Sequence, residues 1–86
     1  MLTNIACLAV KGNLKKIFGE ILKELRLQKG LTQQQLADYT AMDRAFISEL
    51  ERGILLPSLE TFFKLAYELK IKPRDLADKI DQKLKQ

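Results

Sequence analysis

The chain lacks histidine entirely, and Cys7 is the single cysteine among its 86 residues. No disulfide can therefore form within the chain, and neither a zinc site of the cysteine/histidine type nor a catalyst that needs imidazole is available. The apolar run from Ile5 to Val10 is too short to span a membrane, and no basic residue precedes it as in a signal peptide. We expect a cytoplasmic protein that is not an enzyme and uses no metal, cofactor, small-molecule ligand or membrane.

Alternating β-strand patterns, internal repeats and low-complexity segments are absent as well, and apolar residues recur instead every three or four positions. From Leu14 to Gln28 this spacing predicts one amphipathic helix, which the Lys29-Gly30 pair ends. Shorter helices are expected at about 33–39, at about 44–51, after Ser58 and from Pro73. The pattern is typical of a single all-α domain, a compact bundle of five helices.

Residues suited to helix N-termini stand before each of the later helices. Thr32 is followed three positions later by Gln35, as in a capping box. Asp43 and Ser58 are expected to cap the third and fourth helices, and Pro73 suits the first turn of the fifth. The inward stripe of the fourth helix is expected to consist of Leu59, Phe62, Phe63, Ala66 and Leu69.

The net charge of +4 is distributed unevenly along the chain. Residues 11–29 carry six basic against two acidic side chains, and residues 54–86 carry seven against five. Residues 32–53 are acidic, with two arginines against four carboxylates. The basic balance of the whole chain suits a nucleic-acid partner, whereas the acidic middle segment favours a protein partner.

The third predicted helix has an outer face that suits the major groove of DNA. Ile47 and Leu50 lie three positions apart and are expected to face inward. A B-form major groove accepts one helix, small side chains permit close approach, and arginine and serine can bond base edges or phosphates. Such a polar face is, in most proteins, merely solvated. The outer face comprises Arg44, Ala45, Ser48, Glu49 and Arg52.

The helix before it makes this interpretation more specific. Ala37 is small enough for the close crossing of two helices, and Met42 supplies an apolar residue in the turn between them. Together with Ile47 and Leu50, these residues match what a helix-turn-helix motif requires.

The stretch LRLQKGLTQQQLADYTAMDRAFISELERGILLPSLETFFKLAYEL resembles the Cro-like, phage-repressor (XRE) helix-turn-helix family over about residues 17–80. The resemblance implies a lambda-repressor-like bundle of five helices that binds operator DNA, usually as a twofold dimer. It divides the chain into an N-terminal extension, 1–13, and a DNA-binding domain, 14–86, whose helix-turn-helix spans about 33–52. The residues that carry it are Leu25-Arg26, Gly30-Leu31-Thr32-Gln33, Leu36-Ala37, Ile47-Ser48, Glu51-Arg52-Gly53 and Pro57-Ser58-Leu59.

The resemblance also implies roles for individual side chains. Gln33 would contact phosphate or the neighbouring recognition residue, and Arg26 and Glu51 would form a buried ion pair between the first and third helices. Ala41 stands where the family usually has glycine, at a left-handed turn position, which should cost about 1 kcal/mol. The base-reading residues would be Arg44, Ala45, Ser48 and Glu49, and the phosphate contacts would come from Gln33, Arg52, Ser58 and Thr61.

An apolar loop and the last helix are expected to supply a homodimer interface. At least one of the three residues Ile54, Leu55 and Leu56 should be buried against the domain, while the others meet a second subunit. The expected interface consists of Leu55, Leu56, Leu76, Ile80 and Leu84.

The sequence thus predicts a sequence-specific regulator of transcription that binds double-stranded DNA as a homodimer. A restriction–modification controller and a phage-type repressor fit equally well. The alternative is an antitoxin-like or adaptor module that uses the same fold to bind a protein, and the acidic charge of residues 32–53 supports it.

Overall fold

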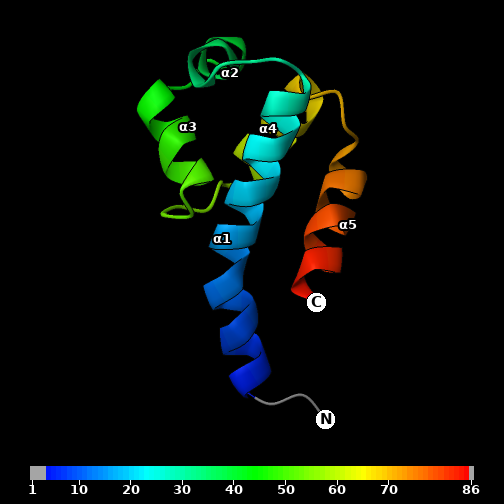
Figure 1. Ribbon diagram of the computed structural model, residues 1–86. Coiled ribbons are helices and arrows are strands. Elements are labelled where there is room, and N and C mark those ends of the chain that lie inside the picture. The colour runs from blue at the N-terminus through cyan, green and yellow to red at the C-terminus, as the bar shows by residue number, and fades with distance from the viewer. Residues whose placement is uncertain (1–3, 86) are drawn as a thin grey trace.

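A computed structural model describes residues 4–85, and the side chains of residues 13–85. It contains five helices and, within those residues, no strand (Figure 1). None of these helices is both long and apolar enough to cross a membrane. The expected all-α, five-helix architecture is confirmed. The helices are α1 (Asn4–Gln28), α2 (Gln33–Thr40), α3 (Arg44–Glu51), α4 (Leu59–Glu68) and α5 (Pro73–Leu84).

The longest helix, α1, is the element on which the others assemble. It packs against α3 on one side and α5 on the other, while α2 contacts α3 and α4 (Figure 1). It begins at Asn4, well before Leu14, and its first turns project past the other helices. The apolar stripe that begins at Leu14 predicted the part of α1 that packs against the other helices, but not the residue at which α1 begins. Residues 1–3 of the expected extension, and the side chains up to residue 12, lie outside the described part.

The core forms where the apolar stripes of all five helices meet. Burying each large apolar side chain contributes about 1.5–3 kcal/mol, so this cluster supplies most of the driving force for folding. Among residues 13–85, Thr40 is the buried neutral polar residue, and its hydroxyl donates to the carbonyl of Leu36 at 2.7 Å. The largest fully buried side chains are Phe18, Leu22, Leu36, Ile47, Leu50, Leu65, Leu69 and Leu76.

Three of the four predicted helix starts have the expected chemistry. The hydroxyl of Thr32 accepts from the Gln35 N–H at 3.0 Å, and the Gln35 side-chain oxygen accepts from the Thr32 N–H at 2.8 Å, which completes the capping box. Ser58 accepts from the Thr61 N–H at 3.1 Å, and Pro73 occupies the first turn of α5.

The prediction that Asp43 caps α3 with its side chain is wrong. Asp43 does occupy the N-cap position, with extended backbone, but its carboxylate makes no capping hydrogen bond. The N–H that it would bind, that of Phe46, donates instead to the backbone carbonyl of Asp43 at 3.1 Å. The carboxylate of Asp43 is therefore exposed and its charge is not used within the domain.

Part of the expected dimer interface is also corrected. Leu76 and Ile80 are only 1% and 7% exposed, because α5 turns this face toward α1 and the core. Leu84 packs partly against the same core. None of the loop residues Ile54, Leu55 and Leu56 is buried, since 46%, 37% and 40% of their surfaces are exposed.

Two residues expected in the inward stripe of α4 are likewise exposed, Leu59 at 74% and Phe63 at 39%. Most of the large apolar side chains that remain exposed thus lie on the α3–α4 loop and α4; Leu27 on α1 and Tyr39 on α2 are exposed as well.

Candidate nucleic-acid interface

The turn between α2 and α3 has the geometry of a helix-turn-helix. Ala41 adopts the left-handed conformation, with φ 56° and ψ 42°, as its place in the turn led us to expect. This conformation lets the Met42 N–H donate to the carbonyl of Ala37 at 2.8 Å, which closes α2. Ala37 is fully buried, and Met42 packs partly against the core. The turn therefore sets the crossing of the two helices.

A glycine in α1 determines how closely α3 approaches. A Cβ added at Gly19 would lie 2.4 Å from the carbonyl oxygen of Leu50 and 2.6 Å from that of Glu51, so only glycine fits this contact. Nothing in the apolar periodicity of the sequence assigns a role to Gly19. The available signal was a lone glycine inside a helical pattern, where it would otherwise weaken the helix.

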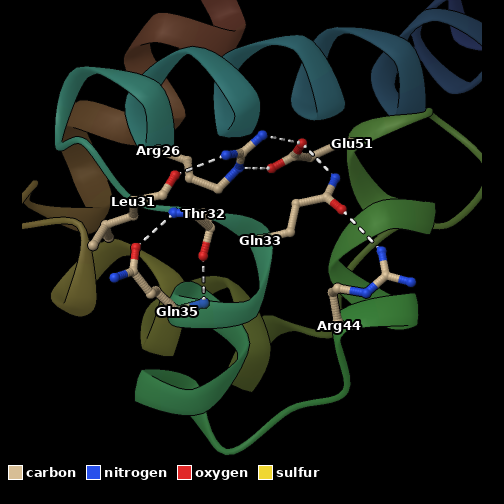
Figure 2. Close-up of polar contacts among 7 residues, drawn as sticks. All are labelled: Arg26, Leu31, Thr32, Gln33, Gln35, Arg44 and Glu51. Atoms are coloured by element: carbon tan, nitrogen blue, oxygen red, sulfur yellow. Dashed lines mark hydrogen bonds and ion pairs between the residues drawn. The ribbon is translucent and has the colours of Figure 1, made fainter.

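A buried ion pair holds the C-terminal end of α3 to α1. Arg26 Nε donates to Glu51 Oε2 at 2.6 Å, and Arg26 Nη2 donates to Glu51 Oε1 at 3.0 Å (Figure 2). The third contact runs from Arg26 Nη1 to the carbonyl of Leu31 at 2.8 Å. The two side chains are 8% and 3% exposed. The hydrogen bond to Glu51 raises the pKa of Arg26 above its usual value in spite of burial.

Gln33 connects this ion pair to the outer face of α3. Its Nε2 donates to Glu51 Oε1 at 3.0 Å, while its Oε1 accepts from Arg44 Nη1 at 3.3 Å (Figure 2). The family resemblance implied that Gln33 contacts either phosphate or the neighbouring recognition residue. The structure contains the second of these contacts, to Arg44.

The outer face of α3 is open. Arg44, Ala45 and Arg52 are exposed, and Ser48 and Glu49 are partly exposed, so another molecule can reach all five side chains. The opposite side of the helix is held in the core by the fully buried Ile47 and Leu50. α3 is therefore held in place with its polar side free, and a B-form major groove is wide enough to admit one such helix.

The hydroxyls of the two residues predicted to contact phosphate at α4 are already paired with each other. Ser58 Oγ donates to Thr61 Oγ1 at 3.0 Å while it accepts from the Thr61 N–H. Ser58 is exposed and Thr61 is partly exposed, so the remaining lone pairs and the helix N-terminus stay accessible.

The charge near α3 is less acidic than the sequence alone suggests. Glu51 is neutralised by Arg26, which lies outside residues 32–53. Two arginines, Arg44 and Arg52, then stand against three carboxylates, those of Asp38, Asp43 and Glu49. A balance of one negative charge remains, and the Asp43 carboxylate, which makes no capping hydrogen bond, contributes to it.

An α2–turn–α3 unit with a left-handed turn and an open second helix defines the helix-turn-helix class of proteins. Residues 22–76 match the helix-turn-helix family, and the chain belongs to this family, to its Cro-like, XRE type.

Among its relatives is the control protein C.BamHI of Bacillus amyloliquefaciens. That protein is 34% identical over 67 residues, which cover 77% of this chain and 83% of C.BamHI.

Solved structures confirm the fold. The restriction-modification controller protein C.AhdI of Aeromonas hydrophila is 44% identical, with a TM-score of 0.69 over 74% of this chain and 96% of C.AhdI. The clp gene regulator ClgR of Corynebacterium glutamicum is 27% identical, with a TM-score of 0.77 over 83% of this chain and 76% of ClgR.

Proposed function

We propose that this chain is a sequence-specific transcriptional regulator that binds double-stranded DNA as a homodimer. Each subunit places α3 in the major groove, and the two helices enter successive grooves about 34 Å apart on a pseudo-palindromic operator. The observation that carries this proposal is the open outer face of a helix whose inner face is fixed in the core. Because the proposed partner is DNA, we infer that the protein acts in the cytoplasm and that its activity is binding and not catalysis.

The relatives favour one kind of regulator. C.AhdI is a restriction-modification controller protein and C.BamHI is a control protein, and both resemble most of this chain. We therefore place a restriction–modification controller ahead of a phage-type repressor.

Residues 14–86 form the proposed DNA-binding domain, with the helix-turn-helix at about 33–52 and residues 1–13 as the extension. Arg44 bonds a guanine edge through two of its N–H groups, and Ala45 approaches a thymine methyl group. Ser48 bonds a base or phosphate, and Glu49 accepts from a cytosine amino group. The phosphates are bound by Arg52, by the α4 start at Ser58 and Thr61, and by the second N–H of the Gln33 amide, which its bond to Glu51 leaves free.

The proposed dimer contact lies on the α3–α4 loop. Leu55 and Leu56 are exposed and follow α3 after only a short turn, so a contact there would fix the position of both recognition helices. Leu84 contributes at its exposed edge, while Leu76 and Ile80 stay in the core of each subunit.

Selection of duplexes from a random pool, followed by binding at several salt concentrations, tests the proposal. A DNA-binding protein enriches one pseudo-palindromic sequence, and the logarithm of its affinity falls linearly with that of salt, by about 0.9 per phosphate neutralised. Arg44→Ala should weaken binding to the enriched duplex. Arg74→Ala, which removes the same charge from the exposed start of α5, should have little effect. No enrichment and no salt dependence would favour the adaptor alternative, which the residual acidity near α3 supports.

A further inference from the structure

Gln33 lies between two groups, and each of them can bond only one end of the Gln33 amide. The Glu51 carboxylate is an acceptor only, and the Arg44 guanidinium is a donor only. Gln33 accordingly turns its NH₂ to Glu51 Oε1, at 3.0 Å, and its oxygen to Arg44 Nη1, at 3.3 Å (Figure 2). The direction of the amide is therefore set by the chemistry of its two neighbours.

We propose that the buried Arg26–Glu51 pair fixes the direction of the Gln33 amide and, through it, the position in which Arg44 meets DNA. Gln33 is then a positioning residue, and Glu51 influences base specificity from inside the domain. The inference rests on the proposed DNA-binding function and adds to it that a buried ion pair influences how strictly Arg44 discriminates between bases.

The ion pair can do this because its own groups cannot turn. Arg26 donates to both oxygens of Glu51 and, through Nη1, to the carbonyl of Leu31 at 2.8 Å. Both ionic side chains are almost fully buried, so water does not replace these contacts. A reversed Gln33 amide would place oxygen against the Glu51 carboxylate and NH₂ against the Arg44 guanidinium. Two attractive contacts would become two repulsive ones.

The fixed amide restrains Arg44 without using up its binding capacity. A guanidinium carries five N–H groups, and Gln33 takes one of them. Enough remain for the bidentate contact to the O6 and N7 atoms of guanine. Arg44 is exposed and would otherwise lose rotamer freedom on binding, a cost that corresponds to about 2- to 10-fold in affinity for one side chain. The restraint should therefore strengthen discrimination at one base pair by a factor of this size.

The experiment uses the full chain and the duplex that it enriches from a random pool. Single base pairs of that duplex are replaced, and the pair whose discrimination is lost in Arg44→Ala is the one that Arg44 reads. Discrimination is measured as the ratio of affinities for the original and replaced duplexes in one preparation. This ratio does not depend on the fraction of folded protein.

Gln33→Met keeps the length of the side chain and removes both hydrogen bonds. We expect it to reduce discrimination at the Arg44 position about 2- to 10-fold and to leave other positions unchanged. In the Arg44→Ala background the same substitution should leave the ratio unaltered. Gln34→Met is the matched control, because Gln34 is the exposed neighbour whose amide bonds Asp38 instead.

Glu51→Gln tests the part played by the ion pair. An amide at position 51 can donate as well as accept, so the direction of Gln33 is no longer dictated. Discrimination should fall as far as in Gln33→Met, and combining the two substitutions should add nothing.

An unchanged ratio in Glu51→Gln, or an equal loss on every duplex in Gln33→Met, would overturn the inference and leave Gln33 as a phosphate contact only, with no part in positioning Arg44. Failure of the wild-type chain to enrich any duplex would instead refute the proposed function itself.

Discussion

The contact between α1 and α3 at Gly19 predicts the effect of a single methyl group. In Gly19→Ala the new Cβ would lie 2.4 Å from the carbonyl oxygen of Leu50 and 2.6 Å from that of Glu51. Both atoms belong to backbone, so no side chain can rotate away. Because a carbon–oxygen contact normally requires about 3.3 Å, α3 must move by roughly 0.9 Å or α1 must bend.

Two opposing effects determine the stability of Gly19→Ala. Overfilling a packed contact costs about 1–3 kcal/mol. Replacing a glycine inside a helix by alanine contributes about 0.5–1 kcal/mol in the other direction. We expect a net loss of about 1–2 kcal/mol, which lowers the midpoint of thermal unfolding of a domain of this size by roughly 4–16 °C.

Urea denaturation followed by circular dichroism measures this free energy of unfolding, and Glu20→Ala, at the exposed next position of α1, is the control. The control should change stability by less than about 0.5 kcal/mol. If Gly19→Ala were stabilising by about 1 kcal/mol, as at an unconstrained helical glycine, then the carbonyls of α3 would not rest against α1 at Gly19.

Ala41→Gly should raise the free energy of unfolding by about 0.5–1 kcal/mol, because glycine adopts φ 56° without strain; a decrease in urea denaturation would contradict this. Glu51→Ala should cost about 3–5 kcal/mol by stranding Arg26, and replacing both residues by methionine should cost less than that, which a double-mutant cycle measures. Arg44→Ala should cost about 1–3 kcal/mol on the enriched duplex and relax one base pair, whereas an equal loss on all sequences would demote Arg44 to a phosphate contact. Leu55→Lys should shift sedimentation toward monomer without lowering stability, and an unchanged dimer would exclude the loop as the interface.

The sequence predicted the elements whose signals are local. The capping box of Thr32 and Gln35 and the proline at the start of α5 depend on residues a few positions apart, and both form as expected. The left-handed turn at Ala41 was also predictable, because the family resemblance located it. The bounds of α3 were predicted to the residue.

Features that depend on distant partners were beyond the sequence. Periodicity identifies the apolar face of α5, but it cannot say whether that face meets the same chain or another copy. Leu76 and Ile80 were therefore assigned to a dimer surface, although they fill the core. The role of Gly19 depends on an approach by carbonyls more than thirty positions later in the chain. Asp43 is an exception among the local signals: it occupies the N-cap position, but the Phe46 N–H bonds its backbone carbonyl and not its side chain.

Glu51 joins the stability of the domain to its proposed specificity. Its carboxylate ties α3 to α1 through Arg26, which neutralises the charge of Glu51, and it orients Gln33 toward Arg44. Substitutions at this position should therefore change both the free energy of unfolding and the base preference. Gly19→Ala acts on the same helix by displacing it as a rigid body, so it should weaken binding to all duplexes and disturb every base-reading contact. Gly19→Ala therefore reports on the position of the whole of α3. A substitution at Glu51 reports, in addition to stability, on the direction of the Gln33 amide on α2.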